Sequence, residues 1–417
     1  MPKPTVHVVG AGLSGLSAAQ ALDPARFQVA IHEAARHAGG RCRSYYDREL
    51  GLTIDNGNHL VLSGNTAVQE HLRIVGAEDK LSGPAAAVFD FMDIASGARW
   101  QVRPNDGPLP WWIFAANRRV PGTGWSDYLA LAKLLRAKPR TPIGDAMSCT
   151  GPLYDKLWRP FLVAALNTEP KASASGLAAN VIRETLAKGG AACRPLVAHD
   201  GLAEAFVDPA LVTLSKRGAT IGFDRRLRAL QIQDGRVAAL DFGDHMVPLG
   251  PDDRVVLAVT ASVAKILLPD LSVPTEFRSI VNAHFLAEAP GDFPALLGTI
   301  NSATEWIFRF PGRLSVTISD ADRFLGQDKD ALAVQIWREV ATAIGRPDLP
   351  LPPHKIITEK RATFAATPEQ DALRPPAATR LGNLVLAGDW VQNGLPSTIE
   401  GSLRSGKNAV TALLARY

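Results

Sequence analysis

The sequence predicts an α/β protein, α+β overall, in which a Rossmann-like domain of discontinuous segments is intertwined with a second domain that contains a mixed β-sheet and helices. Two observations carry this prediction. A short apolar run, Val6 to Val9, leads directly into the turn Gly10-Ala-Gly-Leu-Ser-Gly15. Near the other end of the chain, a second apolar run leads into Gly388 and Asp389. A buried strand that ends in G-x-G-x-x-G and opens a helix is typical of the first βαβ unit of a Rossmann fold.

The spacing of the first turn predicts a pyrophosphate site. Gly10 permits the tight turn, Gly12 lets the backbone approach the ligand, and Gly15 lets the helix pack on the strand. The backbone at Leu13 and Ser14 then lies at the helix N-terminus, where unpaired N–H groups and the positive end of the helix dipole attract an anion.

A second segment narrows the ligand to a flavin dinucleotide. The strand predicted from Gln28 to Ile31 leads to Glu33 and Ala34, where a carboxylate can accept hydrogen bonds from an adenosine ribose. A second glycine-rich turn follows at Gly39 and Gly40, with Arg41 beside it to neutralise the pyrophosphate. Nicotinamide-binding folds do not usually add this second loop. We therefore expect FAD as the cofactor.

Composition and charge exclude several classes of protein. With 417 residues, 46% hydrophobic and 21% charged, the chain is long and apolar enough for two or more folded units rather than a disordered protein. No apolar run is as long as a membrane span, and the first strand begins by Thr5, which leaves no room for a signal peptide. A formal net charge of +4 indicates no nucleic-acid partner but suits weak attraction to an anionic membrane surface.

The cysteines indicate a reducing compartment. Cys42, Cys149 and Cys193 are odd in number and lack metal-ligand spacing, so we expect neither a disulfide framework nor a metal site. The expected location is the cytoplasm, with possible association with the inner face of the cell membrane.

The pattern of apolar runs predicts discontinuous domains. We expect the FAD-binding domain in residues 1–60, 191–270 and 376–417, a helical substrate- and membrane-facing region in 61–190, and a substrate-domain sheet in 271–375. The main strands are predicted at 219–223, 227–232, 237–242, 253–258, 279–286, 305–310, 315–319 and 384–387, and the main helices at 201–217, 329–344 and 398–415.

Three motifs resemble a known family along the whole chain. They are Ile54-Asp-Asn-Gly-Asn-His59, Thr358-Glu-Lys-Arg-Ala-Thr-Phe364 and the block from Leu386 to Gly401. Their order is similar to that of the FAD-dependent amine oxidase and phytoene desaturase superfamily, and within it to the squalene-associated desaturases and hydroxysqualene dehydroxylases of hopanoid biosynthesis. The resemblance implies an apolar C30 isoprenoid substrate. Because no second nucleotide fingerprint is present, an external electron donor is also expected.

The C-terminal block completes the expected cofactor site. Asp389 follows a buried strand at Gly388, where its carboxylate can hold a ribityl hydroxyl; the alternative is a turn residue without a ligand. Pro396, Ser397 and Thr398 precede a helix whose N–H groups are expected to face the flavin pyrimidine oxygens. The resemblance adds four residues to the cofactor-binding set: Gly57, Asn58, His59 and Leu227.

Two histidines are the candidate catalytic residues. His59 follows the polar turn that the resemblance places beside the isoalloxazine, and the alternative is a structural turn residue. His284 shares one face of a predicted strand with Asn282 and is expected either to face the substrate or to be a hydrogen-bonded interior histidine. Lys360 and Arg361 alternate along another strand, so one of them is expected to point inward.

The residues leave three reactions open. They are the reductive dehydroxylation of hydroxysqualene to squalene by hydride transfer to an allylic cation, the oxidative desaturation of squalene- or phytoene-like polyenes, and amine oxidation. Amine oxidases of this fold usually place an aromatic residue two positions before the glutamate of the C-terminal block, where this chain has Thr398. The dehydroxylation is therefore expected first and amine oxidation last.

One aromatic segment suggests a peripheral membrane contact. The run Trp111-Trp-Ile-Phe114, followed by Arg118 and Arg119, is suited to a dock on a lipid surface. The alternative is a buried aromatic cluster under a long loop. The oligomeric state is not predicted by any of these patterns.

Overall fold

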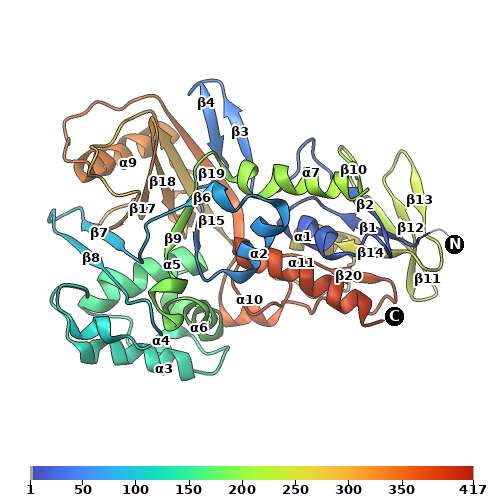
Figure 1. Cartoon of the computed structure of the whole chain (residues 1–417), viewed down its shortest axis with the longest axis horizontal. Helices are drawn as coiled ribbons and strands as arrows, with labels where there is room; N and C mark the ends of the chain where they lie inside the picture. Colours follow the sequence, from blue (N-terminus) through green and yellow to red (C-terminus); the bar gives the residue numbers. More distant parts are fainter. Residues whose placement is uncertain (1–2, 417) are drawn as a thin grey trace.

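A five-stranded parallel sheet forms the core of one half of the molecule, the half predicted to bind a nucleotide. The computed structural model describes residues 3–416, and the strand order in this sheet is β10-β2-β1-β14-β20 (Figure 1). All neighbouring pairs are parallel. Strands from both ends of the chain therefore share one sheet. Their bounds are β1 Thr5–Val9, β2 Gln28–His32, β10 Thr220–Gly222, β14 Arg254–Leu257 and β20 Leu384–Leu386.

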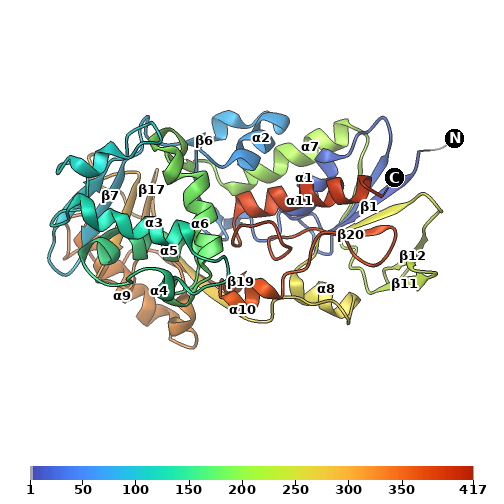
Figure 2. The ribbon, with the colours of Figure 1, turned by 90° about the horizontal axis from the view of Figure 1, so that it is seen from below.

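Different layers cover the two faces of this sheet. Val6 and Val8 of β1 point into a core with four helices: α1 Leu13–Ala21, α2 Thr66–Val75, α7 Asp208–Lys216 and α11 Ile399–Leu414. Val9 belongs to a second core, shared with the antiparallel strands of a small sheet and with a short helix (Figure 2): β11 Ala229–Gln233, β12 Arg236–Asp241, β13 Met246–Pro248 and α8 Ala261–Leu267. Because both faces are buried, the strands read as nearly continuous apolar runs in the sequence.

The other half of the molecule is built on a seven-stranded mixed sheet. Its strand order is β19-β15-β18-β17-β16-β7-β8, and every pair is antiparallel except β16 with β7. This confirms the predicted fold class of a Rossmann-like domain with a mixed-sheet partner. The bounds are β7 Phe89–Asp93, β8 Arg99–Val102, β15 Phe277–Phe285, β16 Leu296–Ile300, β17 Trp306–Phe310, β18 Arg313–Ile318 and β19 His354–Phe364.

Helices cover this sheet on both sides. Helix α9, Lys329–Ala343, packs Ile336 and Trp337 against Val281 and Phe285 on one face. On the other face, Trp306 and Phe308 belong to a large core shared with the helical region. The helices of this region are α3 Ala130–Arg136, α4 Ile143–Ala146, α5 Arg159–Leu166 and α6 Ser175–Glu184 (Figure 1).

Residues 61–190 are not helical throughout, which corrects the expectation for this region. The edge strands β7 and β8 of the large sheet come from it, as do most of β5 Leu60–Leu62 and all of β6 Leu81–Ser82 in a second small sheet, whose central strand β9 Pro195–Ala198 lies outside it. Strand β7 pairs with β16, some 200 residues further along the chain. Such long-range pairing leaves little trace in local sequence, because the partner supplies the hydrogen bonds. The remaining elements are the hairpin β3 Ser44–Asp47 with β4 Leu52–Asp55 and the helix α10 Pro368–Ala372.

The expectation for Lys360 and Arg361 is wrong. Both side chains are exposed. The pairing of β15 with β19 shifts register here, since Ile280 pairs with Glu359 but Arg278 pairs with Thr363. The extra residues in β19 form a bulge, which breaks the alternation on which the expectation depended.

Among residues 3–416, no helix is both long and apolar enough to cross a membrane.

A buried carboxylate joins the C-terminal helix to the N-terminal half. The side chain of Glu400, 3% exposed, accepts hydrogen bonds from the backbone N–H groups of Ala67 (3.1 Å) and Val68 (3.0 Å). It also accepts one from Arg404 at 2.8 Å. Helix α2 begins at Thr66 without a cap from its own N-cap side chain. Glu400 therefore takes the place of the local cap and satisfies two of the unpaired donors of α2.

Replacing Glu400 should destabilise the fold more than replacing an exposed glutamate. We expect Glu400→Gln to lower the free energy of unfolding by about 1–3 kcal/mol, because an amide N–H₂ would face buried donors. Glu204→Gln removes an exposed ion pair with Lys80 (3.3 Å) and should change it by less than about 0.5 kcal/mol. Thermal unfolding of both variants under the same conditions measures the difference. Equal losses in the two variants would contradict the capping role.

Candidate functional site

The first glycine turn forms a cradle open to a ligand. A Cβ at Gly10, where φ is +106°, would overlap the carbonyl oxygen of Ala258, and one at Gly15 would overlap the carbonyl oxygen of Gly10. A Cβ at Gly12 would meet no atom within 4 Å. Helix α1 begins after Gly12 without a side-chain cap, so the N–H groups at Leu13 and Ser14 are available to an anion. The open space at Gly12 lies where the spacing predicts a pyrophosphate.

The second glycine turn lies directly against the first. Gly39 forms an isolated parallel bridge with Gly12, and its N–H donates to the carbonyl oxygen of Ala11 at 2.8 Å. Gly39 and Gly40 have φ of +101° and +59°, which glycine adopts without strain. A Cβ at Gly40 would be 3.6 Å from the Gly12 Cα. The structure therefore brings the two turns together on one side of the cradle.

Glu33 stands at the end of β2, beside the cradle. Its carboxylate accepts hydrogen bonds from the N–H groups of Ala11 (2.7 Å) and Ala35 (2.8 Å). The backbone of Glu33 also pairs with Gly222 and Arg225, so the segment that leads to the buried Leu227 crosses beside it. Ala34 is exposed. Two fixed hydrogen bonds orient the Glu33 carboxylate for further donors such as ribose hydroxyls.

An ion pair joins the N-terminal and C-terminal parts of the site. Arg41 Nη2 lies 2.7 Å from Asp389 Oδ1, and Arg41 also donates to the carbonyl oxygen of Ala362. Burial alone would raise the pKa of Asp389, but the charge and hydrogen bond of Arg41 outweigh it and lower the pKa. Asp389 is therefore a carboxylate at neutral pH, fixed as an acceptor for a hydroxyl.

Sequence reasoning missed Arg374, which shapes the loop after Asp389. This buried arginine donates through Nη2 to the carbonyl oxygens of Asp389 (3.1 Å) and Val391 (2.8 Å), and through Nη1 to Asp371 at 3.0 Å. Its guanidinium lies 4.8 Å from the centre of the Phe364 ring. A planar group with five donors can hold several carbonyls at once, which lysine cannot. The only signal in the sequence was its position between the two family motifs.

The last residues of the C-terminal block cap the N-terminus of α11. Thr398 Oγ1 accepts the N–H of Gly401 at 3.0 Å and caps the helix. Gly394 has φ of +82°, and its carbonyl oxygen accepts from Asn180 at 2.8 Å. Pro396 is buried, and Ser397 lies between it and the cap. The block thus ends in a fixed turn, and its residue Thr398 has a structural role whether or not a ligand is bound.

The segment Asp55–Asn58 rests on the large sheet through a polar network. Asn282 Oδ1 accepts from the N–H of Asn58 (3.3 Å) and from Thr317 Oγ1 (2.8 Å), and its Nδ2 donates to the carbonyl oxygen of Asn56. A Cβ at Gly57 would lie 3.2 Å from Asn282 Nδ2. The Oδ1 atom of Asn58 is buried and has no partner within residues 3–416. A buried acceptor without a partner indicates a donor supplied by a ligand.

His284 lies under this segment. It is fully buried; Nδ1 is 2.8 Å from Ser315 Oγ, and Nε2 is 3.2 Å from the carbonyl oxygen of Asp55. Burial, aided by the nearby charge of Arg313, lowers its pKa to about 3. The predicted face shared with Asn282 is present, but it meets the Asp55–Asn58 segment. Both ring nitrogens already have partners.

Unlike His284, His59 has a ring without a hydrogen-bond partner among residues 3–416. It is half-buried at the end of the same segment, and no hydrogen bond of its ring is present within the described part of the chain. Burial and the charge of Arg41 lower its pKa to about 4. The imidazole is therefore neutral at neutral pH and available to a neighbouring ligand.

Taken together, these residues fit a flavin dinucleotide. A bound anion would fill the open space at Gly12 and pair with the uncapped N-terminus of α1, and a ligand donor would pair with Asn58 Oδ1. Glu33 and Asp389 supply fixed carboxylates at separate points. In FAD the pyrophosphate links an adenosine to a ribityl chain, which matches this order of groups.

Comparison with known proteins agrees with this geometry. The model of the family described as flavin containing amine oxidoreductase matches residues 13–414. A hydroxysqualene dehydroxylase of Rhodopseudomonas palustris is 53% identical over 412 residues, which cover 99% of this chain and 98% of the relative. A hydroxysqualene dehydroxylase of Sinorhizobium fredii is 50% identical over 415 residues, covering 100% and 99%.

More distant relatives share the fold. A 15-cis-phytoene desaturase of Synechococcus elongatus is 21% identical over 479 residues, covering 99% of this chain and 96% of the relative. The solved cyclohexylamine oxidase of Brevibacterium oxydans superposes with a TM-score of 0.68 at 16% identity and covers 99% of each chain. The site and the full-length matches lead to one conclusion: the chain belongs to the flavin-containing amine oxidoreductase family.

Proposed function

We propose that this chain is an FAD-dependent hydroxysqualene dehydroxylase that converts hydroxysqualene to squalene within hopanoid biosynthesis. The observation that carries the proposal is the 53% identity over 412 residues to a protein of that name, together with the complete set of residues that fit FAD. Desaturation of a related polyene is the second candidate, supported by distant desaturase relatives that are 21–27% identical to this chain.

The reaction exchanges a hydroxyl for a hydride. Reduced FAD, when bound, supplies the hydride that reaches the allylic carbon as the protonated hydroxyl leaves as water. The chain has three tasks in this reaction. It holds the cofactor through the two glycine turns, Glu33 and Asp389; it keeps water from the cationic carbon; and it holds a proton near the leaving oxygen.

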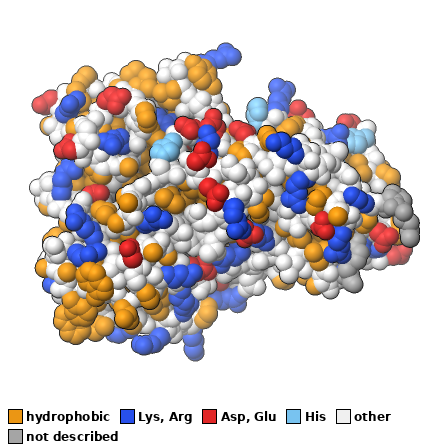
Figure 3. Space-filling model, in the orientation of Figure 1, with side chains coloured by type: hydrophobic (Ala, Val, Ile, Leu, Met, Phe, Trp, Pro, Cys, Tyr) orange, Lys and Arg blue, Asp and Glu red, His pale blue; other side chains and the backbone are white. Residues whose placement is uncertain are grey.

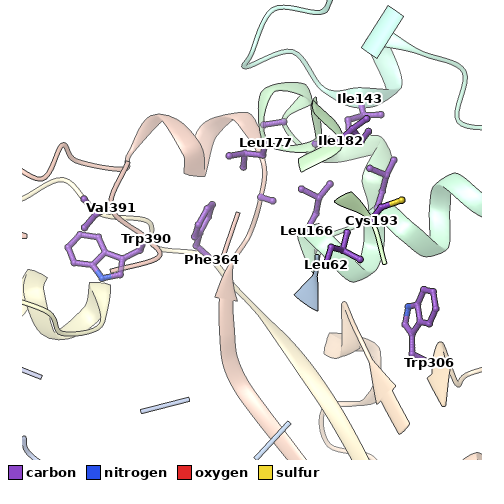
Figure 4. Packing of buried hydrophobic residues seen from close by; sticks show 14 of the residues in the cluster. Leu62, Ile143, Leu166, Leu177, Ile182, Cys193, Trp306, Phe364, Trp390 and Val391 are labelled. Carbon is purple, nitrogen blue, oxygen red and sulfur yellow. The ribbon is translucent and has the colours of Figure 1, made fainter. Parts of the chain in front are cut away.

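The buried apolar residues between the large sheet and the helical region suit a dry substrate site. Leu166 of α5, Phe364 of β19 and the adjacent pair Trp390 and Val391 belong to one hydrophobic cluster (Figure 4). The cluster reaches from helices α5 and α6 to the residue that follows Asp389. A C30 chain would be desolvated here, where an allylic cation is not trapped by water.

His59 is the residue we propose as proton holder. Its ring has no partner in residues 3–416, whereas both nitrogens of His284 are occupied. His284 then acts as a positioning residue that holds the carbonyl of Asp55 and so the start of the Asp55–Asn58 segment.

The partners we propose follow from the chemistry. Electrons come from an external donor, because the chain carries one nucleotide fingerprint. A C30 isoprenoid is almost insoluble in water, so the enzyme meets it at a membrane surface, at the inner face of the cell membrane.

Anaerobic turnover tests the proposed reaction. Flavin-loaded protein, reduced with dithionite and incubated with hydroxysqualene, should yield squalene in proportion to the reducing equivalents supplied. Product analysis by gas chromatography measures it. If the oxidised protein instead converts squalene to a more unsaturated product and the reduced protein leaves hydroxysqualene unchanged, desaturation is the activity.

A side chain at Gly12 should abolish cofactor binding. In Gly12→Val the added atoms would occupy the open space that the pyrophosphate needs, so the purified protein should be colourless. Gly291→Val is the matched control, because a Cβ there also meets nothing within 4 Å but lies on a surface turn. Visible flavin absorbance per chain measures both variants. A Gly12→Val protein with one flavin per chain would contradict the site.

The pH dependence should identify the proton holder. A general acid with a pKa of about 4 is protonated in a fraction that falls tenfold per pH unit above that value. The kcat/KM of the wild type should therefore fall about tenfold per unit between roughly pH 5 and 7. His59→Gln should remove this slope.

His284→Asn is the control for that experiment. It should keep the slope and lower the thermal midpoint, because its partners Ser315 and Asp55 lose a buried hydrogen bond. A slope that survives in His59→Gln but disappears in His284→Asn would reverse the two roles.

A further inference from the structure

Large apolar side chains gather on one exposed segment of the helical region. Five of the seventeen large hydrophobic residues that are exposed in residues 3–416 lie within 109–129. Figure 3 shows hydrophobic side chains together at the lower left, where α3 and α4 lie in Figure 1. We call these five residues the apolar patch: Leu109 (78% exposed), Trp111 (52%), Phe114 (62%), Trp125 (50%) and Leu129 (55%).

The local structure puts these residues on one side. Trp111–Phe114 is a single 3-10 turn, in which side chains three apart lie above one another. This places Trp111 and Phe114 together. Trp125 and Leu129 bound a second turn, and the Trp125 ring is 5.8 Å from the Phe114 ring. The contact between Phe114 and Trp125 therefore joins the two turns, and Leu109 lies just before the first of them.

The packing of the first turn fixes which of its side chains are exposed. Trp112 and Ile113, between the two exposed residues of the first turn, are each 7% exposed. Trp112 stands edge-on to Tyr128 at 5.2 Å, and the Tyr128 hydroxyl accepts the N–H of Val120. The predicted dock of four residues is thus corrected: Trp112 and Ile113 are anchors in the core, and Trp111 and Phe114 face outward.

The charge around the patch is strongly positive. Residues 103–140 contain two aspartates and seven basic residues, so their net charge is +5. Because the whole chain carries +4, the remaining residues have a net charge of −1. The Arg118 guanidinium lies 4.7 Å from the centre of the Trp111 ring, at the edge of the patch. The basic residues are Arg103, Arg118, Arg119, Lys133, Arg136, Lys138 and Arg140.

We propose that the apolar patch docks the enzyme on the surface of an anionic lipid bilayer, with the tryptophan and phenylalanine rings among the headgroups and the surrounding cations against the lipid charges. Exposed rings within a basic surface are suited to a membrane interface. A second copy of the chain is a poor occupant, because two surfaces rich in basic residues would repel each other. The proposal rests on the proposed function in one respect: the bilayer is where a C30 substrate is dissolved.

The anchors connect the dock to the substrate site. Trp112, Ile113 and Tyr128 belong to the same buried cluster as Leu166, Phe364 and Trp390, the last three of which are labelled in Figure 4. The anchors of the patch and the proposed substrate site therefore share one apolar cluster. Since the patch lies on the helical region, the nucleotide-binding half stays in water.

Vesicle sedimentation tests the dock. Flavin-loaded wild type should pellet with vesicles of phosphatidylcholine and phosphatidylglycerol, and weakly with phosphatidylcholine alone. Trp111→Ser with Phe114→Ser should weaken binding by about tenfold or more, since two interfacial rings are lost. Met246→Ser with Ile266→Ser, at 54% and 74% exposure outside the patch, should bind as the wild type does. Added salt should weaken binding of all forms.

Turnover separates this proposal from the proposed function. Trp111→Ser with Phe114→Ser should keep its flavin and its turnover of detergent-dissolved hydroxysqualene, but lose turnover of substrate held in vesicles. If the wild type binds vesicles and turns over neither form, the proposed function fails and the dock stands. Wild type that stays in the supernatant, or a double variant that binds as tightly as the wild type, overturns the dock. Self-association that the double variant abolishes would make the patch a protein interface instead.

Discussion

The close contact between the first and last segments of the chain is the constraint on which the rest of the structure depends. Helices α1 and α11 approach so closely that a Cβ at Gly406 would overlap the Ser14 carbonyl oxygen, and Ser17 donates to the carbonyl oxygen of Leu403 at 2.7 Å. The Arg41–Asp389 ion pair continues the contact across the site. Because a cofactor held at both ends would bridge the same segments, its binding and the closure of the chain stabilise each other.

Buried polar groups then align the two halves of the molecule. Arg374 holds the carbonyls of the loop after Asp389, and Asn282 holds the backbone of Asn56 and Asn58. Both groups join a nucleotide-binding segment to another part of the fold. Buried donors and acceptors are costly when unpaired. These hydrogen-bond networks therefore favour a single relative position of the segments that they join. The polar groups therefore set the position of the Asp55–Asn58 segment on the large sheet, while apolar packing supplies most of the stability.

The two halves of the molecule also differ in their chemistry. The glycine turns and carboxylates of the nucleotide-binding half suit a charged, hydrogen-bonding cofactor. The sheet and helices of the other half contribute most of their buried apolar side chains to one large cluster that extends into the nucleotide-binding half, which suits a hydrocarbon and a cationic carbon. The exposed aromatic residues lie at the far end of that cluster from Asp389. One chain thus carries a polar end for the cofactor, an apolar middle and an amphipathic outer surface.

The sequence by itself determined the Rossmann-like core, the two glycine turns and the C-terminal block, because each depends on local backbone conformations that only certain residues adopt. It also determined the family, through motifs that are contiguous in the chain. Tertiary structure decided what depends on distant partners. The strand β7 needs β16; Glu400 caps a helix over 300 residues away; and Arg374 reaches a loop that its own neighbours do not reveal. It also decided that Trp111 and Phe114 are exposed and Trp112 buried, since exposure depends on what packs beneath a turn and not on the residues within it.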